Sequence, residues 1–413
     1  MISKKWFRDD FEFLKERMQG RDIDISVLEK IRDLDKEMLV IKSELDIVRS
    51  EKNLLSKKFE NSKVEKMKKM KIHLQELENK YETKKREFDH LISIVPAVPD
   101  LETPPLEDQE ILVWGKIDRF KEYKSYLELS LKIELIDLKS SVRNAGSGFS
   151  TYTDKGEKII RALIAFTLDW AERHGFKRYY LPVIVNRDSL FCTSQISKFQ
   201  DTIFQIKNSE DKFLSPTAEV QLVNLYRGQI IEKKELPIKV CANTNCFRNE
   251  KMGAGTESKG IMRLYQFIKT ELVMFVEEAE SENALNYLSG IIEGILKELN
   301  LPFRKLLLSR KELSFSATKT YDFEVWMPSE KKYREISSLS NTRDFQSNRG
   351  KIRYKQEILD PKEKSKNVHI LNGSCLAIDR LFAAILENYQ LPNGDIQVPT
   401  CLINYLHMEK ISK

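Results

Sequence analysis

Apolar residues recur at alternating spacings of three and four along the first part of the chain. The series runs through Leu28, Ile31, Leu34, Met38, Ile41, Leu45, Val48 and Leu55, and resumes after a polar break at 60–63 with Met67, Met70, Leu74, Leu77, Tyr81, Phe88, Leu91 and Val95. Lys84 fills the one polar position of the repeat, and residues 26–94 contain no glycine or proline. This repeat on both sides of a short break predicts an antiparallel coiled-coil hairpin over about residues 26–94.

The predicted hairpin is long, and its tip is basic. At 1.5 Å per residue, helices of ~33 residues give an arm of roughly 50 Å, which we expect to project into solvent. Lysines flank the tip at positions Lys52, Lys57, Lys58, Lys63, Lys66, Lys68, Lys69 and Lys71. Basic charge at the end of an arm favours nucleic acid, although a solvated coiled-coil face explains the same charges.

The pattern changes after a proline-rich stretch at 95–105, which reads as a linker between an N-terminal domain, 1–100, and a second domain, 101–413. Amphipathic helices are expected at 158–174 and 281–299, and strand-like runs at 178–181, 239–242, 266–275, 321–326 and 368–371. The sequence therefore predicts an α+β fold with a largely antiparallel sheet. No glycine-rich phosphate loop occurs, so side chains would have to hold any nucleotide.

Composition narrows the function classes. The 69 Lys+Arg against 63 Asp+Glu give a net charge of +6, which permits a polyanionic partner without demanding one. The five cysteines are odd in number and lack C-x-x-C spacing, so we expect neither a disulfide framework nor zinc. The charged N-terminus and the lack of a long apolar stretch predict a soluble, cytoplasmic protein without a membrane segment.

Charged residues interrupt an apolar strand pair at Cys246-Phe-Arg-Asn-Glu250 and at 261–275. Arg248 and Glu250 would share one face of the first strand, and Arg263, Phe267, Lys269 and Glu271 would share one face of the second. A half-exposed hairpin with charges in solvent is the alternative reading. The combination resembles the second motif of class II aminoacyl-tRNA synthetases, in the form F-R-x-E, a Gly/Ala-rich loop and R-x-x-Q-F-x-K-x-E that is typical of seryl-tRNA synthetases.

That resemblance implies roles for these residues. Arg248 would contact the α-phosphate of ATP, Glu250 the adenine, and Phe267 would stack under the base, with Arg263 also at the nucleotide. The segment 214–220 resembles the family's T-x-E element, in which Thr217 and Glu219 would bind the ammonium of serine beside Arg248. Thr217 as a helix N-cap is the alternative reading.

Two further segments extend the likeness. Residues 371–390 resemble the third class II motif, a strand, a small-residue turn and a helix entered through an arginine. Arg380 would then meet the γ-phosphate, while Asn372 and Ser374 face the serine. The segment Tyr333-Arg-Glu-Ile-Ser-Ser-Leu-Ser-Asn341 resembles the family's E-I-S-S-x-S-N and assigns Mg²⁺ to Glu335 and Ser338, oxygen ligands of the kind that a hard cation prefers.

The chain departs from the family pattern at a few places. Cys375 replaces a usual glycine, which leaves the volume of the serine pocket open, and Phe191-Cys-Thr-Ser-Gln195 replaces a common F-G-T-G-Q. Lys251 and Met252 replace small residues in the loop that would meet the tRNA acceptor end, and residues 118–153 match poorly.

The resemblance implies an ATP-dependent ligase that forms seryl-adenylate and transfers serine to tRNA(Ser), and it leaves open whether tRNA(Sec) is also charged. Arg248, Arg380 and Glu335 would carry the chemistry, Glu271 would accept a hydrogen bond from the serine hydroxyl, and Lys57, Lys58, Lys66 and Lys69 would bind tRNA. A homodimer is implied through residues 158–182. A specialised paralogue and a non-catalytic tRNA-binding protein remain as alternatives.

Overall fold

The structure is a computed structural model that describes residues 1–56, 64–117, 122–196, 200–249 and 260–413. Its compact units are Met1–Val98 and Pro99–Lys413. The predicted functional residues Lys57, Lys58 and Glu250, together with the departures at Lys251 and Met252, lie outside the described residues.

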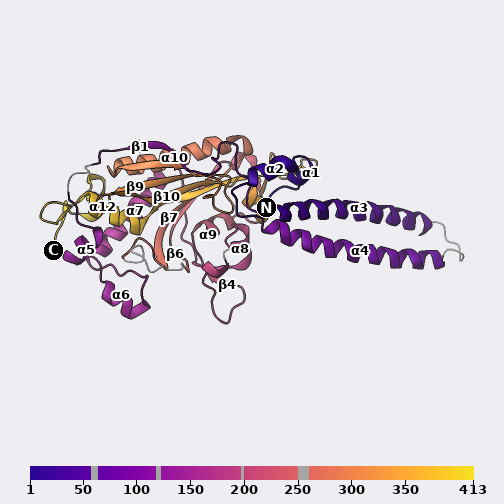
Figure 1. Ribbon diagram of the computed structural model, residues 1–413, viewed down its shortest axis with the longest axis horizontal. Helices are drawn as coiled ribbons and strands as arrows, with labels where there is room; N and C mark the ends of the chain where they lie inside the picture. Colours follow the sequence, from indigo (N-terminus) through magenta and orange to yellow (C-terminus); the bar gives the residue numbers. More distant parts are fainter. Residues whose placement is uncertain (57–63, 118–121, 197–199, 250–259) are drawn as a thin grey trace. The chain divides into compact units, whose positions relative to one another are not determined.

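Unit Met1–Val98 contains the predicted helical hairpin. The helices are α1 (Lys5–Arg8), α2 (Phe11–Met18), α3 (Ile25–Ser56) and α4 (Val64–Ser93), and Figure 1 shows α3 and α4 lying side by side. Ile41 and Leu45 of α3 pack against Leu74 and Leu77 of α4, which confirms the repeat that the sequence predicted. One position differs, because Ile92 is buried in place of the predicted Leu91.

Ion pairs cross the hairpin along its length. Lys30 pairs with Glu87 at 2.6 Å, Lys84 with Glu37 at 2.5 Å and Arg49 with Glu78 at 2.8 Å. Lys84, the polar member of the repeat, is therefore accommodated by a carboxylate of the opposite helix. Exposed pairs of this kind contribute at most about 1 kcal/mol each, so they mainly select the antiparallel register while the apolar seam stabilises the hairpin.

Unit Pro99–Lys413 is built on a large sheet, with eight strands among the described residues, in the order β1-β8-β9-β10-β13-β7-β6-β2. The strands are β1 (Gln109–Trp114), β2 (Lys177–Arg178), β6 (Ile238–Phe247), β7 (Gln266–Val276), β8 (Phe303–Leu307), β9 (Lys319–Met327), β10 (Lys332–Asn341) and β13 (His369–Ala377). All neighbours in the sheet pair antiparallel except β2 with β6. The α+β fold with a largely antiparallel sheet is confirmed.

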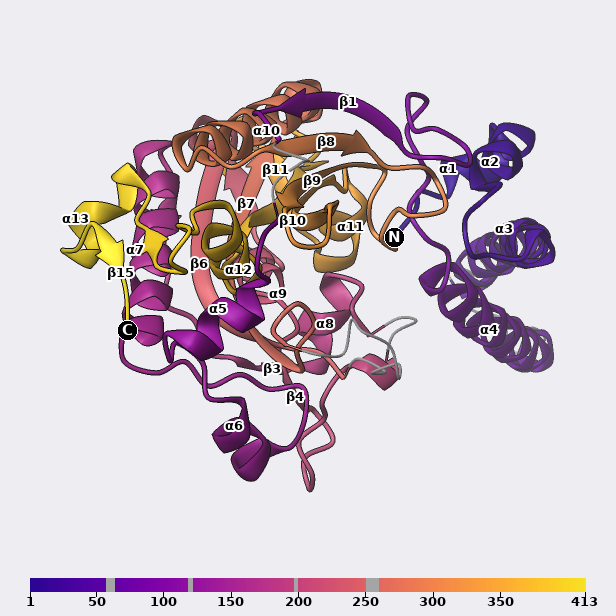
Figure 2. The same ribbon diagram turned by 60° about the vertical axis from the view of Figure 1, so that its left-hand side comes forward.

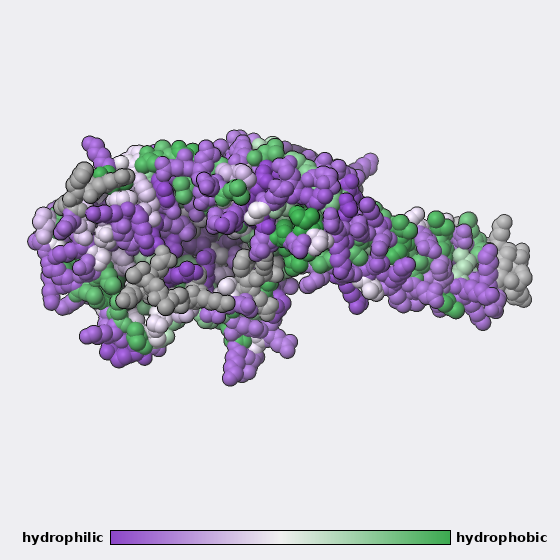
Figure 3. Space-filling model, in the orientation of Figure 1, coloured by the Kyte–Doolittle hydropathy of each residue, from purple (hydrophilic) through white to green (hydrophobic). Residues whose placement is uncertain are grey.

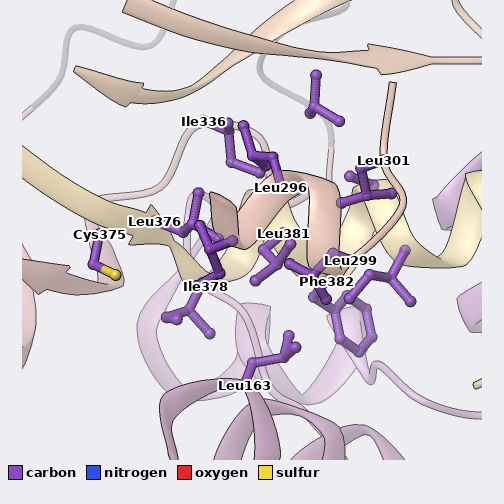
Figure 4. Close-up of a cluster of buried hydrophobic side chains, with 14 of the residues drawn as sticks. Leu163, Leu296, Leu299, Leu301, Ile336, Cys375, Leu376, Ile378, Leu381 and Phe382 are labelled. Atoms are coloured by element: carbon purple, nitrogen blue, oxygen red, sulfur yellow. The ribbon is translucent and has the colours of Figure 1, made fainter. Parts of the chain in front are cut away.

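Helices α7 (Lys155–Arg173), α10 (Ser281–Glu298) and α12 (Ile378–Asn388) cover one face of this sheet (Figure 2). Side chains alternate across the sheet, so Leu272 and Met274 of β7 join the core under these helices while Val273 and Phe275 point to the other face. Figure 4 shows part of this core, in which Leu381 and Phe382 of α12 pack beside Leu296 of α10.

Smaller elements surround the sheet. The helices are α5 (Tyr126–Lys132), α6 (Leu138–Ala145), α8 (Arg187–Cys192), α9 (Glu219–Asn224), α11 (Phe345–Gly350) and α13 (Ile403–Leu406), with 3₁₀ turns at Gln200–Thr202, Lys233–Glu235, Glu278–Glu280 and Thr400–Leu402. The short strands are β3 (Ile184–Asn186), β4 (Lys212–Leu214), β5 (Ile230–Glu232), β11 (Arg353–Lys355), β12 (Lys366–Asn367), β14 (Ile396–Gln397) and β15 (Lys410–Ile411). No helix in the described part of the chain is long and apolar enough to cross a membrane.

Candidate active site

A cavity of about 560 Å³ lies on the sheet face opposite α7, α10 and α12. The space-filling view in Figure 3 shows a hollow with hydrophilic residues in its wall on this unit. Its lining includes ten of the residues singled out from the sequence: Glu219, Arg248, Arg263, Phe267, Glu271, Glu335, Ser338, Asn372, Ser374 and Arg380. Segments far apart in the sequence thus meet in one polar cavity, of a size that suits a small-molecule ligand.

Glu271 is the most deeply buried carboxylate of the predicted set, with 2% of its surface exposed. Its Oε2 accepts a hydrogen bond from Thr217 Oγ1 at 2.9 Å and forms an ion pair with Lys269. Ser374 of β13 lies directly opposite Glu271 in the sheet. A buried carboxylate held by two donors is a rigid acceptor for a further polar group in the cavity.

Thr217 is buried but is not among the residues that line the cavity. The structure makes Ala218 the N-cap residue of α9, so the alternative reading of Thr217 as the N-cap is not what is found. The Thr217 hydroxyl nevertheless accepts a 3.3 Å hydrogen bond from the Glu219 backbone N–H while donating to Glu271. Thr217 therefore ties the start of α9 to strand β7.

Glu219 is also buried and accepts hydrogen bonds from two amides. Gln346 Nε2 donates to its Oε1 at 2.6 Å, and Asn372 Nδ2 donates at 3.1 Å. Burial, followed by the neighbouring negative charge of Glu271, raises the pKa of Glu219 to about 7. Gln346, in the segment Asp344-Phe-Gln of the sequence, was not singled out as a site residue.

The pKa of Glu219 predicts a pH dependence. An ammonium ligand binds the ionised carboxylate, so the affinity for an amino acid should rise as the pH increases through about 7 and level off above it. For serine, the amino acid that the sequence resemblance implies, kcat/KM should then follow this curve between about pH 6 and pH 8. A Glu219→Gln variant should lose most of the activity together with this pH step, and an unchanged pH step in that variant would exclude Glu219 as its source.

Arg248 follows strand β6 instead of lying within it, and Arg263 precedes strand β7, which corrects the predicted strand bounds. Pairing between the strands stops here because the Tyr265 N–H donates to Gly148 O, while Arg248 N–H still donates to Tyr265 O at 2.9 Å. The Arg248 guanidinium lies 5.2 Å from the centre of the Phe267 ring. A cation and an aromatic surface therefore stand side by side in the cavity.

Arg380 lies in the first turn of α12. Its Nη1 donates to Glu335 O at 2.7 Å and lies 3.3 Å from Glu335 Oε2, and its Nε donates to Met262 O. The predicted small-residue turn before this helix is instead part of strand β13, which continues to Ala377. Gly373 is needed there because a Cβ would lie 2.8 Å from the backbone oxygen of Ser338.

Cys375 does not face the cavity. Along β13, Asn372 and Ser374 line the cavity, whereas Cys375 is buried in the core beside α7, with its Sγ 3.7 Å from Thr167 O (Figure 4). The substitution of the family's glycine by Cys375 thus leaves the wall of the cavity unchanged.

Glu335 and Ser338 reach the same cavity although they are three residues apart. A register shift between Glu335 and Ser337 interrupts strict alternation in β10 and brings both side chains to one face. Asp322, opposite Ser338 on β9, also lines the cavity and was missed from the sequence. Burial, followed by the charge of Glu335, raises its pKa. Asp322 is a carboxylate within the apolar run 321–326, and this feature of the sequence could have identified it as a site residue.

Comparison with known proteins identifies the family. Residues 1–99 match the Seryl-tRNA synthetase N-terminal domain, and residues 201–389 match the tRNA synthetase class II core domain (G, H, P, S and T). The serine–tRNA ligase of Malacoplasma penetrans is 39% identical over 100% of both chains, and that of Nautilia profundicola is 40% identical over 98% of this chain and 100% of its own.

The fold agrees with a solved member. Seryl-tRNA synthetase from Pyrococcus horikoshii, complexed with ATP, superposes with a TM-score of 0.94 at 28% identity, covering 100% of this chain and 99% of that chain. Both domain matches, the full-length relatives and this superposition agree with the motifs that line the cavity. The chain belongs to the seryl-tRNA synthetase family of class II aminoacyl-tRNA synthetases.

Proposed function

We propose that this protein activates L-serine with ATP and transfers it to tRNA(Ser). In the first step the serine carboxylate attacks the α-phosphorus, giving seryl-adenylate and pyrophosphate, and in the second the terminal ribose hydroxyl of tRNA takes the seryl group and AMP leaves. The observation that carries this proposal is the meeting of two cations, Arg248 and Arg380, with the buried carboxylates Glu219 and Glu271 in one cavity.

The two arginines are assigned to the triphosphate. Arg248 would bind the α-phosphate beside an adenine stacked on Phe267, with Glu250 at the base, and Arg380 would bind the γ-phosphate from the opposite side. Hydrogen bonds to Glu335 O and Met262 O hold the Arg380 side chain, and the Arg248 guanidinium lies beside the Phe267 ring, so both cations have fixed neighbours in the cavity. Preorganised charge of this kind lowers the barrier to phosphoryl transfer without a side-chain nucleophile.

The buried carboxylates are assigned to the amino acid. Glu219, with Thr217 beside it, would hold the ammonium, while Asn372 and Ser374 of β13 complete the wall around the substrate. Glu271 would accept a hydrogen bond from the serine hydroxyl. Alanine lacks that hydroxyl and would leave the buried carboxylate without this partner, whereas threonine would be refused by its extra methyl group.

The residues around Glu335 fit a magnesium ion. Asp322 Oδ1 is buried without a hydrogen-bond partner among the described residues, next to Glu335 and Ser338. These oxygens suit Mg²⁺, which is usually bound by one or two carboxylates together with substrate phosphates. The described residues contain no group of three or more His, Cys, Asp or Glu side chains suited to a metal, so the phosphates would supply the remaining ligands. When bound, the ion would orient the triphosphate and neutralise its charge.

The hairpin α3–α4 is assigned to tRNA. Lys66 and Lys69 are exposed on α4 near the start of that helix, and Lys57 and Lys58, which lie outside the described residues, are proposed to bind tRNA as well. Lysines there would meet the phosphates of an RNA duplex, which proteins recognise mainly by shape and backbone. The assignment is to a stem of tRNA(Ser) rather than to a base sequence.

Two further assignments follow from the family. We place the interface of a homodimer at α7 and β2, where the sheet ends in a short strand and Tyr180 is fully exposed. We also place the enzyme in the cytoplasm, where a reducing environment suits its five free cysteines. The relatives named above give no support to a specialised paralogue or to a non-catalytic binding protein.

Replacement of Glu271 should separate serine recognition from ATP binding. In Glu271→Ala the serine hydroxyl loses its charged acceptor, so serine-dependent pyrophosphate exchange should fall by about tenfold to a hundredfold. Calorimetric binding of a non-hydrolysable ATP analogue should stay close to that of the wild type. Glu271→Gln, which keeps the volume, serves as the matched variant and should lose less. An equal loss of ATP binding and of exchange would show that Glu271 does not define the amino acid.

The first step is tested by ATP–pyrophosphate exchange with a panel of amino acids. The proposal predicts exchange with serine, and far weaker exchange with alanine and threonine. Exchange with another amino acid of the panel in preference to serine would overturn the assignment of the cavity.

A further inference from the structure

Ser194 adopts a backbone conformation that favours glycine. Its φ is 69°, in the left-handed region, where a residue with a Cβ is disfavoured. It lies in Phe191-Cys-Thr-Ser-Gln195, at a position where the resembling family pattern usually has glycine. A glycine would satisfy this backbone without strain, so the serine needs another explanation.

The turn that contains Ser194 is fixed from several sides. Ser194 N–H donates to Phe191 O at 3.0 Å, and Gln195 N–H donates to Leu190 O at 2.9 Å. Arg349 Nη1 of α11 donates to the same Phe191 O at 3.2 Å. The surroundings therefore impose the left-handed conformation on Ser194, and the side chain does not select it.

The hydroxyl of Ser194 is unsatisfied as well. The residue is 3% exposed, and its Oγ is buried with no hydrogen-bond partner among the described residues. Ser194 also lines the cavity, together with Thr193 and Gln195. A buried hydroxyl without a partner is unfavourable, and strain maintained beside a substrate cavity points to a functional constraint.

The position of the turn associates Ser194 with the amino-acid end of the cavity. Cys192 Sγ, two residues before it, lies 3.9 Å from Gln346 O, and the Gln346 side chain donates to Glu219. Gly350 of α11 leaves room for this contact, since a Cβ there would lie 2.6 Å from Cys192 Sγ. The turn thus packs on the helix that holds the carboxylate assigned to the ammonium.

We propose that Ser194 is an additional substrate-binding residue, whose hydroxyl accepts a hydrogen bond from the ammonium group of the amino acid held by Glu219. Rotation about the Cα–Cβ bond carries Oγ between staggered positions and would turn it from its buried site toward the ligand. This inference rests on the proposed function of the cavity. It assigns this chain a contact that a glycine at the same position could not make.

Two substitutions separate the hydroxyl from the backbone strain. Ser194→Ala removes Oγ and keeps Cβ, whereas Ser194→Gly removes both. The loss of one hydrogen bond should raise KM for serine about threefold to tenfold in both variants, while KM for ATP in pyrophosphate exchange stays unchanged. Both variants remove the unsatisfied buried hydroxyl, and Ser194→Gly should raise the melting temperature more than Ser194→Ala, because only glycine also relieves the left-handed conformation.

Lys331→Gly is the matched control. Lys331 also has a positive φ, 52°, but is exposed in the turn between β9 and β10 and does not line the cavity. This variant should gain stability with no change in either KM. Wild-type KM for serine in both Ser194 variants, or a rise in KM for ATP instead, would overturn the inference. A wild-type enzyme with no serine-dependent exchange would instead contradict the proposed function itself.

Discussion

Replacement of Arg248 or Arg380 by alanine is expected to lower the rate of serine-dependent pyrophosphate exchange by about 10²- to 10³-fold. Each change removes a preorganised cation from the cavity wall, and the loss of one such donor costs about 3–4 kcal/mol in the transition state. The effect should fall on kcat at saturating ATP, since the charge that these residues stabilise develops as pyrophosphate leaves.

Arg304→Ala controls for the loss of an arginine from the same sheet. Arg304 lies on β8, pairs with Glu324 and does not line the cavity, so its removal should leave exchange near the wild-type rate. Near-normal exchange in Arg248→Ala or Arg380→Ala would show that the triphosphate lies elsewhere.

Shortening the hairpin should abolish tRNA charging while sparing amino-acid activation. Removal of residues 42–78, with a short flexible loop joining Ile41 to Asn79, keeps the ion pairs of Lys30 with Glu87 and Lys84 with Glu37 at the base. It also keeps the contacts of α1 and α2 with α3, such as the 2.5 Å pair of Arg8 with Asp35. No residue assigned to the adenylate is removed, so exchange should persist.

A gentler version of this experiment neutralises Lys66 and Lys69. If each lysine contacts one phosphate, the slope of log affinity for tRNA against log salt should flatten by up to about 0.9 per lost contact. Lys85→Gln is the matched control, since Lys85 lies further along α4 and pairs with Asp89 at 3.4 Å. For the enzyme that lacks residues 42–78, charging of tRNA at the wild-type efficiency would show that the hairpin has only a structural role.

Periodicity was sufficient to predict the hairpin because both helices bury a narrow apolar seam against each other. The shift from Leu91 to Ile92 occurs near the end of α4, where the repeat allows either a three- or a four-residue step. The antiparallel sheet was also predictable from short alternating runs, since charged residues such as Lys269 and Glu271 marked the face that became the cavity.

Features that depend on irregular backbone could not be read from the pattern. Glu335 and Ser338 share a face only because of the register shift in β10. The pairing of β6 with β7 ends at Tyr265 because its N–H donates a hydrogen bond to the O of Gly148, which lies far away in the sequence. Gln346 belongs to the site because its side chain donates a hydrogen bond to Glu219, and Asp322 belongs to it because it lines the cavity. Tertiary contacts of this kind leave little trace in a single sequence.

The central claim is tested most directly by charging purified tRNA(Ser) with labelled serine. The account predicts ATP-dependent formation of seryl-tRNA by the wild-type enzyme, which is lost in Arg380→Ala and in the enzyme with the shortened hairpin. Serine-dependent pyrophosphate exchange without any charging of tRNA(Ser), or charging with an amino acid other than serine, would contradict it.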